Sequence, residues 1–396
     1  MSNEREVVVL SAVRTAIGGY GGSLKDFPPV DLAAMCVREV VKRGNVEPQE
    51  VGHCVFGNVI HTEQRDMYLS RVACVNGGLP VETPALTVNR LCGSGLQAIV
   101  SASQSIILDD ADCAVAGGAE VMSRGQYWLP TLRWGQRMND GAVVDAMVGA
   151  LTDPFDDCHM GVTAENIAQK WQISREDQDA FAVESHERAV HATDNGYFKD
   201  QILPIEIKSK KATTVFDTDE HFRRGSSVEQ MAKLRPVFNR DGTVTAGNAS
   251  GINDAAAAVL LMERKRAEQQ GLKPLARLVG YAHAAVEPKY MGIGPVPAVR
   301  KLLDKTGLGI DDLDVLEVNE AFAAQALAVV RDLGLPADRT NPNGSGISLG
   351  HPIGATGTIL TVKAVHELQR TGGRYALVTM CIGGGQGIAA IFERLD

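Results

Sequence analysis

Residues 87–106 read TVNRLCGSGLQAIVSASQSI, and residues 348–368 read SLGHPIGATGTILTVKAVHEL. Each stretch begins with small or apolar residues, opens a helix at a glycine-containing start, and leads to another buried strand. Those strands read CAVAGG at 113–118 and YALVTMCIGGG at 375–385. Two parts of the chain therefore share one order of elements.

The likeness extends upstream of both stretches. Residues 32–60 and 299–324 each read as an apolar helix, a turn and a strand, which ends at Asn58 in one and at Asn319 in the other. Cys92 follows Asn58 by 34 residues, and His351 follows Asn319 by 32 residues. Any two α/β stretches look somewhat alike, but similar offsets at four landmarks favour a duplication. Alternating strands and helices predict an α/β fold built from two related halves.

The segment between the halves, residues 122–252, is less regular. It contains Trp128, Trp134, Trp171 and several short helical runs, and we interpret it as an inserted loop domain. The expected division is an N-terminal half at 1–121 completed by 253–274, the loop domain, and a C-terminal half at 275–396. From Lys199 to Arg235, eight Lys and Arg face six Asp and Glu. This stretch is either a solvated surface or a site for a phosphate-rich ligand.

Composition excludes several classes of protein. The net charge of −9 argues against general binding to nucleic acid or to a membrane surface. No apolar run approaches the roughly 18 residues of a membrane span. The N-terminus lacks the apolar core of a signal peptide, and we expect a cytoplasmic protein. Seven widely spaced cysteines without a CxxC pair predict neither a disulfide framework nor a metal site.

Cys92 stands at the start of a helix, in Cys92-Gly93-Ser94-Gly95. The positive end of a helix dipole stabilises a thiolate, which is the reactive form of cysteine. The glycines let a substrate or another backbone approach, and exposed N–H groups could stabilise an oxyanion. A buried cysteine at a tight strand–helix junction is the alternative interpretation.

His351 lies in Gly350-His351-Pro352-Ile353-Gly354. Pro352 suits the first position of a helix, because its missing N–H costs nothing there. His351 is therefore expected at a helix N-terminus, where the dipole disfavours imidazolium and keeps the ring neutral, as a general base requires. The alternative is a histidine that only caps the helix.

Cys381 and Asn319 are weaker candidates. Cys381 lies between a buried strand and Gly383, Gly384 and Gly385, and could act as a second acid or base, or be a core cysteine beside a turn. Asn319 and Glu320 follow a strand, where helix capping is the more common role. Two thiols, a neutral histidine and glycine-rich turns together suit acyl transfer followed by proton abstraction next to a carbonyl.

Over essentially its whole length the chain resembles the thiolase family. The matching motifs, in the family's order, are VRTAIGGYGGSLKD (13–26), NRLCGSGLQAI (89–99), GGAEVMS (117–123), HMGVTAEN (159–166), TAGNASGINDAAAA (245–258), MGIGPVPA (291–298), NEAFAAQ (319–325), NPNGSGISLGHPIGATG (341–357) and CIGGGQG (381–387). Several of these motifs are individually specific. The resemblance implies a layered αβαβα fold with two five-stranded mixed sheets and a loop domain that covers coenzyme A.

The resemblance also implies roles for single residues. Cys92 would be acylated and His351 would take its proton. Asn319 would hold a water that forms one oxyanion hole with His351, and the amides of Cys92 and Gly383 would form the other. Cys381 would deprotonate the incoming acetyl-CoA. The pantetheine channel would be lined by His159, Ala246, Ser250 and Ala321, with walls from Met160, Phe238, Met291 and Phe322 and with Arg223 near the nucleotide phosphates.

Substrates, partners and alternatives follow from the same resemblance. Acetyl-CoA, acyl-CoA and CoA would be substrates, no cofactor would be needed, and the chain would form a homo-oligomer, either a tetramer or a dimer. The chain looks particularly like bacterial β-ketothiolases that accept longer 3-ketoacyl-CoAs than acetoacetyl-CoA, which serve fatty acid metabolism and polyhydroxyalkanoate biosynthesis. A ketoacyl synthase would place histidine where Cys381 stands. A cysteine hydrolase would need no second thiol, and a non-enzymatic binding module would need none of Cys92, His351 and Cys381.

Overall fold

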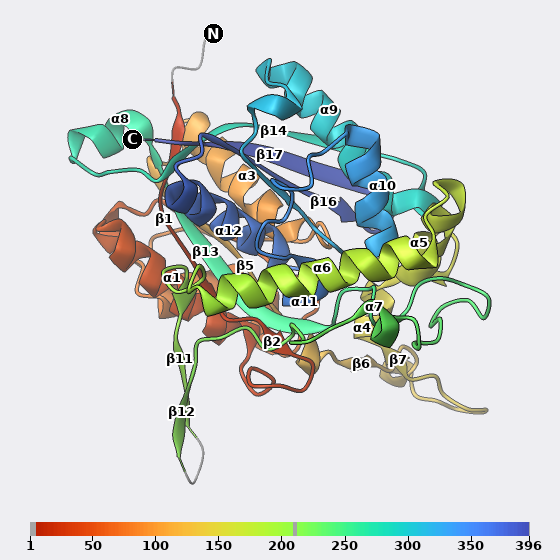
Figure 1. Ribbon diagram of the computed structural model, residues 1–396. Helices are drawn as coiled ribbons and strands as arrows, with labels where there is room; N and C mark the ends of the chain where they lie inside the picture. Colours follow the sequence, from red (N-terminus) through yellow and green to blue (C-terminus); the bar gives the residue numbers. More distant parts are fainter. Residues whose placement is uncertain (1–4, 209–211, 396) are drawn as a thin grey trace.

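The computed structural model describes residues 5–208 and 212–395, and its main feature is a mixed β-sheet in two halves (Figure 1). Ser209, Lys210 and Lys211, part of the basic stretch singled out above, lie outside the described residues. The first half of the sheet has the order β1-β13-β5-β3-β4. Its strands are β1 (Val7–Thr15), β3 (His53–Gly57), β4 (Ala85–Val88), β5 (Cys113–Val121) and β13 (Asn253–Glu263).

The second half repeats this pattern in the order β14-β17-β16-β15. Its strands are β14 (Ala276–Ala285), β15 (Val315–Val318), β16 (Tyr375–Ile382) and β17 (Gln386–Arg394). Strand β15 runs parallel to β16, as β3 runs parallel to β5, and β17 is antiparallel to both its neighbours, as β13 is. The predicted duplication is therefore visible in the topology.

Two details differ from a pair of separate five-stranded sheets. Where β4 stands in the first half, the second half has only an isolated bridge between Leu316 and Thr340. In addition, β1 pairs with β14 at two positions, Val8 with Arg277 and Val9 with Ala276, so the halves share one hydrogen-bonded path. Backbone groups at the inner edges, which would otherwise be unpaired, satisfy each other at this junction.

Helices cover both sheets and separate them, which confirms the predicted αβαβα layers (Figure 1). Helices α1 (Pro29–Gly44) and α2 (Leu69–Asn76) pack on the outer face of the first half. Helix α9 (Pro295–Thr306) covers β14 and β17, and α10 (Ala323–Leu333) lies beside it. The central layer consists of α3 (Ser94–Ile107) and α12 (Thr356–Thr371), which contact each other between the sheets.

Glycines allow the two central helices to approach each other at their N-terminal ends. A Cβ atom on Gly95 would lie 2.7 Å from the backbone nitrogen of Thr358, and one on Gly357 would lie 2.3 Å from that of Leu96. Both distances are too short for real side chains, so only glycine permits this contact. The matching glycines of the two repeats thus bring the chain before α3 close to the chain before α12.

Residues 122–252 lie mainly across one end of the two halves (Figure 1). They form β6 (Tyr127–Trp128), β7 (Val144–Asp145), α4 (Ala146–Ala150), β8 (Thr152–Asp153), β9 (Cys158–His159), α5 (Met160–Lys170), α6 (Arg175–Asp194), β10 (Ile202–Leu203), β11 (Ile205–Lys208), β12 (Thr213–Phe216) and α7 (Val228–Met231). A buried ion pair between Arg14 and Asp219 (2.7 Å) ties this segment to β1.

The remaining short elements of the described residues are β2 (Gly18–Gly19), α8 (Arg264–Gln269), α11 (Gly346–Leu349) and 3₁₀ helices at Pro48–Glu50, Gln64–Tyr68, Met122–Arg124, Leu132–Trp134, Pro288–Ile293 and Ile310–Asp312. Among the described residues, no helix is both long and apolar enough to cross a lipid bilayer.

Candidate active site

A cavity of about 320 Å³ opens where the chain segments before α3 and α12 meet. Twelve of the fourteen residues singled out from the sequence line it: Cys92, His159, Met160, Phe238, Ala246, Ser250, Met291, Ala321, Phe322, His351, Cys381 and Gly383. Asn319 lies directly behind His351, and Arg223 lies elsewhere. Residues from both halves and from the inserted segment therefore form one site.

Cys92 is presented by a strained turn. Leu91, immediately before it, has a φ of 44°, in the left-handed region that a bulky residue rarely adopts. The hydroxyl of Ser94 accepts a hydrogen bond from the Arg90 amide (2.8 Å) and donates one to the Leu91 carbonyl (2.7 Å), which closes the turn. Helix α3 then begins at Ser94 with Gly93 as its N-cap. Cys92 is thereby held at the cavity and is not fully buried.

The expectation that the helix dipole makes Cys92 a thiolate is wrong in direction. Burial raises the pKa of the Cys92 thiol to about 11, although hydrogen bonds from the backbone N–H groups of Gly383 and of Cys92 itself act to lower it. Cys92 therefore holds its proton at neutral pH and needs a base to react. The same two N–H groups point at the sulfur, next to the position where an oxyanion would form on an attacked carbonyl.

The helix that Pro352 was expected to open begins later, so His351 does not stand at its N-terminus. Helix α12 begins at Thr356, because Pro352 to Ala355 first form a separate turn with amide hydrogen bonds to the Pro352 carbonyl. The His351 amide donates to Oδ1 of Asn253 (3.0 Å), which fixes the backbone. The ring is buried, and burial lowers the pKa of His351 to about 4. The imidazole is thus neutral, as predicted, but through loss of solvent and not through the dipole.

Hydrogen bonds also select the tautomer of His351. Its Nδ1 atom lies 2.7 Å from Oγ1 of Thr356, and that hydroxyl donates to the Pro352 carbonyl at 2.9 Å. A hydroxyl has one proton, and a carbonyl can only accept. Nδ1 must therefore carry the ring proton and donate it to Thr356. This leaves the Nε2 lone pair of His351 free to accept a proton.

Asn319 is fully buried beside His351. Its Nδ2 atom lies 3.4 Å from Nε2 and 3.5 Å from Nδ1 of His351, and its Oδ1 atom has no hydrogen-bond partner among the described residues. A buried amide oxygen without a partner is a natural place for an ordered water. The capping interpretation of Asn319 is wrong, because α10 begins only at Ala323, with Phe322 as its N-cap.

Glu320 has a different environment from Asn319. Its buried carboxylate accepts hydrogen bonds from the hydroxyl of Ser185 (2.6 Å), Nδ2 of Asn341 (2.9 Å) and the amide of Ile347 (3.3 Å). Glu320 thus joins three segments of the chain and does not line the cavity.

Cys381 lies near the end of β16 and faces the cavity, with only 1% of its surface exposed. Burial raises the pKa of its thiol far above the usual range, and the nearby Cys92 raises it further. The turn that follows contains Gly384 and Gly385 at φ values of 78° and 84°, which glycine adopts without strain. This turn places Gly383 in the cavity wall beside both cysteines.

Aromatic rings and a loop form the outer part of the cavity. His159 is the N-cap of α5, and its Nδ1 atom accepts from the Gly161 amide (3.0 Å), so Nε2 carries the ring proton. Its ring stacks on Phe238 at 4.6 Å, and Phe238 meets Phe322 edge-on at 6.2 Å. The loop that contains Ser250 is held against Ala321 by an amide–carbonyl bond of 2.9 Å.

Arg223 does not line the cavity. It is exposed and borders a separate surface depression, with His191, Asp194 and Ser226 among its neighbours. Its amide donates to Nδ1 of His186 (3.2 Å), which anchors the backbone and leaves the guanidinium outside.

Sequence reasoning missed Glu120 as a part of the site. Its buried carboxylate accepts hydrogen bonds from the amides of Val59, Ile60 and Gly354 and from the side chain of Asn58, all between 2.9 and 3.1 Å. It thereby joins the first half to the turn that follows His351. The signal was present, since an acidic residue within the apolar strand of GGAEVMS needs such partners.

Comparison with known proteins identifies similar chains. The models of the thiolase N-terminal and C-terminal domains match residues 7–265 and 272–394. The chain is 65% identical over 392 residues to the "Beta-ketothiolase BktB" of Cupriavidus necator, which covers 99% of this chain and 100% of that protein. It is 48% identical over 396 residues to an acetyl-CoA acetyltransferase of Syntrophomonas wolfei, again over 99% of this chain and 100% of that protein.

Solved structures agree with these matches. Human mitochondrial 3-ketoacyl-CoA thiolase in complex with CoA superposes with a TM-score of 0.96 at 46% identity, over 99% of this chain and 98% of that chain. An acetyl-CoA acetyltransferase of Bacillus anthracis gives a TM-score of 0.97 at 47% identity, over 99% of each chain.

Proposed function

The chain belongs to the thiolase family, and we propose that it catalyses the reversible Claisen condensation of acetyl-CoA with an acyl-CoA, giving a 3-ketoacyl-CoA and CoA. It is an acyltransferase. One observation carries the mechanism: Cys92, His351, Cys381 and Gly383, which come from distant parts of the sequence, line a single cavity. Cys381 in that wall disfavours a ketoacyl synthase, which would have histidine there.

In the first half-reaction the Cys92 sulfur attacks the thioester carbonyl of an acyl-CoA. Nε2 of His351, which carries no proton in the resting tautomer, takes the proton of the Cys92 thiol. The amides of Cys92 and Gly383 donate to the oxyanion of the tetrahedral intermediate. Coenzyme A leaves as a thiolate and takes the proton of Cys381. The products are acyl-Cys92, a protonated His351, a Cys381 thiolate and CoA.

In the second half-reaction the Cys381 thiolate removes a proton from the methyl group of a second acetyl-CoA. The enolate oxygen accepts hydrogen bonds from His351 and from a water held by Asn319, whose Oδ1 atom lacks a partner within residues 5–208 and 212–395. The enolate carbon attacks the acyl carbonyl and expels Cys92 as a thiolate, which recovers its proton from His351. Cys381 keeps the methyl proton, so all protons balance and the free enzyme is restored.

The shape of the cavity supports coenzyme A thioesters as substrates. The outer wall of apolar and aromatic side chains, among them Met160, Met291 and Phe322, suits a narrow pantetheine arm and an acyl chain of a few carbons. The Cupriavidus necator relative is named a β-ketothiolase, which supports 3-ketoacyl-CoAs as the substrates of thiolysis. We propose no additional cofactor, because the two thiols and the imidazole supply every proton transfer of the cycle.

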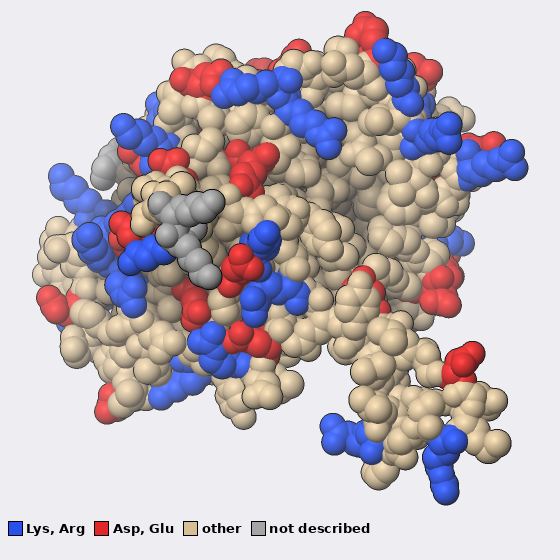
Figure 2. Space-filling view, turned by 90° about the horizontal axis from the view of Figure 1, so that it is seen from below, with Lys and Arg blue, Asp and Glu red and all other residues tan. Residues whose placement is uncertain are grey.

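We also propose that the chain acts as a homo-oligomer, and specifically as a tetramer. An arm at residues 127–148 projects from the body and carries few charges over much of its surface (Figure 2). Its apolar side chains are strongly exposed, including Trp134 at 86% and Met138 at 81%. Such an apolar surface is costly in water and suits contact with the same arm of a second copy. A second candidate interface is the outer edge of β4, where Leu86 is exposed.

A cytoplasmic location completes the proposal. All seven cysteines are free, including pairs close in space such as Cys54 and Cys74, which suits a reducing compartment.

Incubation with acetyl-CoA and isotopically labelled CoA tests the function. A thiolase exchanges label between CoA and acetyl-CoA and forms acetoacetyl-CoA. A cysteine hydrolase would release acetate, and a binding module would do neither. Absence of both exchange and acetoacetyl-CoA, with correctly folded protein, would overturn the proposal.

A further inference from the structure

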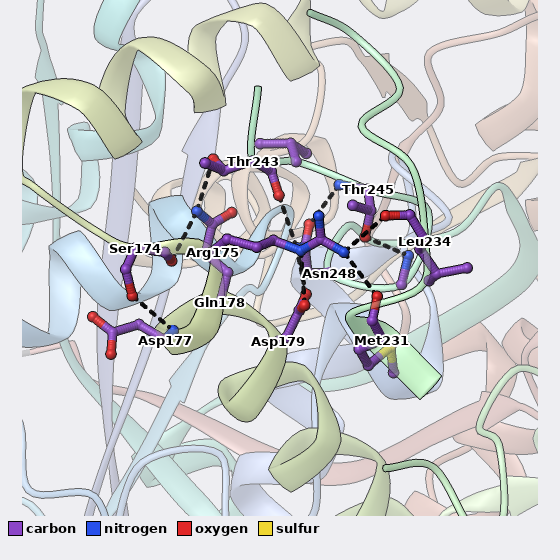
Figure 3. Close-up of polar contacts among 12 residues, drawn as sticks. Ser174, Arg175, Asp177, Gln178, Asp179, Met231, Leu234, Thr243, Thr245 and Asn248 are labelled. Carbon is purple, nitrogen blue, oxygen red and sulfur yellow. Dashed lines mark hydrogen bonds and ion pairs between the residues drawn. The ribbon is translucent and has the colours of Figure 1, made fainter. Parts of the chain in front are cut away.

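A buried hydrogen-bond hub lies behind the outer wall of the cavity, centred on the side chain of Asn248 (Figure 3). Its Nδ2 atom donates to Oδ1 of Asp179 (2.9 Å) and to the carbonyl of Thr243 (3.1 Å), and its Oδ1 atom accepts from the amide of Thr245 (2.8 Å). Every polar atom of this amide group is therefore paired.

The hub holds the loop that forms part of the cavity wall. Thr245, Ala246, Ala249, Ser250 and Gly251 all line the cavity, and Asn248 lies in the middle of this run. The Asn248 carbonyl accepts from the amide of Ala323 (2.8 Å), at the start of α10. The position of the loop thus depends on the direction in which the Asn248 side chain is held.

Asp179 determines that direction from outside the cavity. It lies on α6, is buried, and does not line the cavity. Its second oxygen, Oδ2, accepts from Nε of Arg175 (2.7 Å), and the same guanidinium donates to the carbonyls of Met231 and Leu234 (Figure 3). An ionised acceptor with two fixed donors is stronger and more directional than a neutral one.

A neighbouring contact reinforces the same loop. Nε2 of Gln178, which is also buried, donates to Oγ1 of Thr243 (2.9 Å) and to the carbonyl of Ser174 (3.2 Å). The N-terminal part of α6 therefore holds the loop at Thr243 and at Asn248, two residues before and three residues after Thr245.

We propose that Asp179 is a positioning residue for coenzyme A thioesters: through Asn248 it fixes the loop at 245–251 in the conformation that receives the pantetheine arm. This inference rests on the proposed function and extends it to residues outside the cavity. Asp179 touches none of Cys92, His351 and Cys381 through any hydrogen bond of the described residues. Its loss should therefore weaken substrate binding and leave the chemical groups intact.

The Asp179→Asn variant tests this by separating binding from chemistry. Asparagine has the same size, but it lacks the charge and one of the acceptor oxygens. We expect KM for acetyl-CoA and Kd for CoA to rise about tenfold, in line with loss of a hydrogen bond to a charged group, while kcat stays within about threefold. The matched control is Asp177→Asn on the same helix, which weakens an exposed ion pair with Arg331 and a contact with the side chain of Ser174, and should leave both constants unchanged.

Two further variants keep the proposal falsifiable if Asp179→Asn folds poorly. Arg175→Lys keeps the charge but loses the planar guanidinium that donates to two carbonyls. It should raise KM and Kd less than Asp179→Asn does, again with little change in kcat. In the double variant Asp179→Asn/Asn248→Ala the two increases in KM should not multiply, because both act through one contact. Independent, multiplicative effects would show that Asp179 does not act through Asn248.

A measurement that does not depend on activity completes the test. Amide hydrogen exchange of the peptide at 243–251 should accelerate in Asp179→Asn and not in Asp177→Asn, while alkylation of Cys92 by iodoacetamide proceeds at the wild-type rate. If KM, Kd and amide hydrogen exchange of Asp179→Asn all match the wild type, the positioning role is wrong. If the wild-type protein itself neither binds CoA nor exchanges label, the proposed function fails instead.

Discussion

The Nδ1 atom of His351 lies 2.7 Å from the hydroxyl oxygen of Thr356, and the same hydroxyl donates to the carbonyl of Pro352. This chain of two hydrogen bonds keeps the proton on Nδ1 and the lone pair on Nε2. Thr356, five residues after His351, therefore determines which ring nitrogen of His351 can act as the base.

Thr356→Val should slow acetylation of Cys92 by about 10- to 100-fold, which is part of the ~10²–10⁴-fold that a general base supplies. Valine keeps the shape but cannot accept the Nδ1 proton, so the wrong tautomer becomes populated. Single-turnover acetylation by acetyl-CoA, followed by mass spectrometry, measures the effect. Thr361→Val is the control, since that buried hydroxyl donates only to the Gly357 carbonyl. Thr356→Ser should restore the rate, and a Thr356→Val enzyme of normal rate would rule out this role.

His351→Ala should be more severe than Thr356→Val. The variant loses the base and also a donor to the enolate oxygen, and removal of one such donor typically costs ~3–4 kcal/mol. The cost of losing the base and the cost of losing the donor need not add, because the side chain of His351 serves both roles. Single-turnover acetylation at a near-normal rate would remove His351 from the mechanism.

The rate of acetylation should show no inflection near pH 6.5, because burial lowers the pKa of His351 to about 4. The lowered pKa of His351 also makes the folded state less stable at acidic pH. Between pH 6.5 and 4 the unfolded chain binds a proton at this histidine that the folded chain does not, so folding is penalised as pH falls. At pH 5 the penalty is about 2 kcal/mol. Chemical unfolding at pH 7.5 and pH 5 should therefore show a smaller loss of stability in His351→Asn than in the wild type.

Cys92 should be the thiol that acetyl-CoA protects from alkylation. Of the seven cysteines only Cys92 and Cys158 are not buried, so these two compete for a small reagent. Because burial raises the pKa of Cys92 to about 11, its labelling by iodoacetamide should still rise with pH above 9. Peptide mass mapping of the wild type and of Cys158→Ser separates the two sites. Earlier labelling of a buried cysteine, or a lack of protection at Cys92, would contradict the assignment.

The sequence predicted the duplicated fold and most of the residues that line the cavity, because both depend on motifs that can be recognised from the order of the residues alone. The glycines in the first turns of α3 and α12 are an example, since the close contact of the two helices requires Gly95 in one repeat and Gly357 in the other. The ends of helices were harder to predict. Pro352 suggested a helix start, but the turn closed by its own carbonyl delays α12 to Thr356. Local propensity cannot anticipate such a turn.

Electrostatics was the least predictable part of the site. The helix dipole suggested a thiolate at Cys92, yet burial raises the pKa of this thiol more than the backbone hydrogen bonds of Gly383 and Cys92 lower it. The depth of burial depends on residues far away in the sequence, such as Ile382, which packs against Gly93. Glu120 and Asn248 were missed for the same reason, since Glu120 binds Asn58 and Gly354 and Asn248 binds Asp179, all on other segments of the chain. Thr356 was missed although its partners His351 and Pro352 are near in the sequence, because the tautomer of His351 depends on the three-dimensional contact.

Thiolysis should extend beyond acetoacetyl-CoA to the five-carbon 3-ketovaleryl-CoA. Met160 and Met291 in the cavity wall are unbranched and can adapt to an extra methylene. One methylene changes discrimination by only ~1–3 kcal/mol, so activity should decline gradually with chain length. Initial rates with a series of 3-ketoacyl-CoAs provide the measurement, and no detectable turnover of the five-carbon compound would refute this range.

Cys92 and Cys381 should be separable by mutation, because the two half-reactions need different bases. Cys92 carries the acyl group while the second acetyl-CoA loses its proton, so it cannot be the base for that step. Cys381 is the other thiol in the cavity, close enough for the charge of Cys92 to raise its pKa. Cys381→Ala should therefore still acetylate Cys92, at a rate a few-fold below the wild type, because the leaving CoA loses its proton donor.

The same variant should lose most formation of acetoacetyl-CoA and most exchange of the acetyl methyl protons with deuterated water. Cys92→Ala should lose acetylation altogether, and Cys158→Ser is the control for removal of a thiol outside the cavity. Acetyl-enzyme is weighed by mass spectrometry, and deuterium incorporation is followed by NMR. Condensation by Cys381→Ala at close to the wild-type rate would mean that another group removes the proton. The neutral imidazole of His351 would then be the remaining base in the cavity, and the double variant Cys381→Ala/His351→Ala would have to abolish the exchange that Cys381→Ala retains.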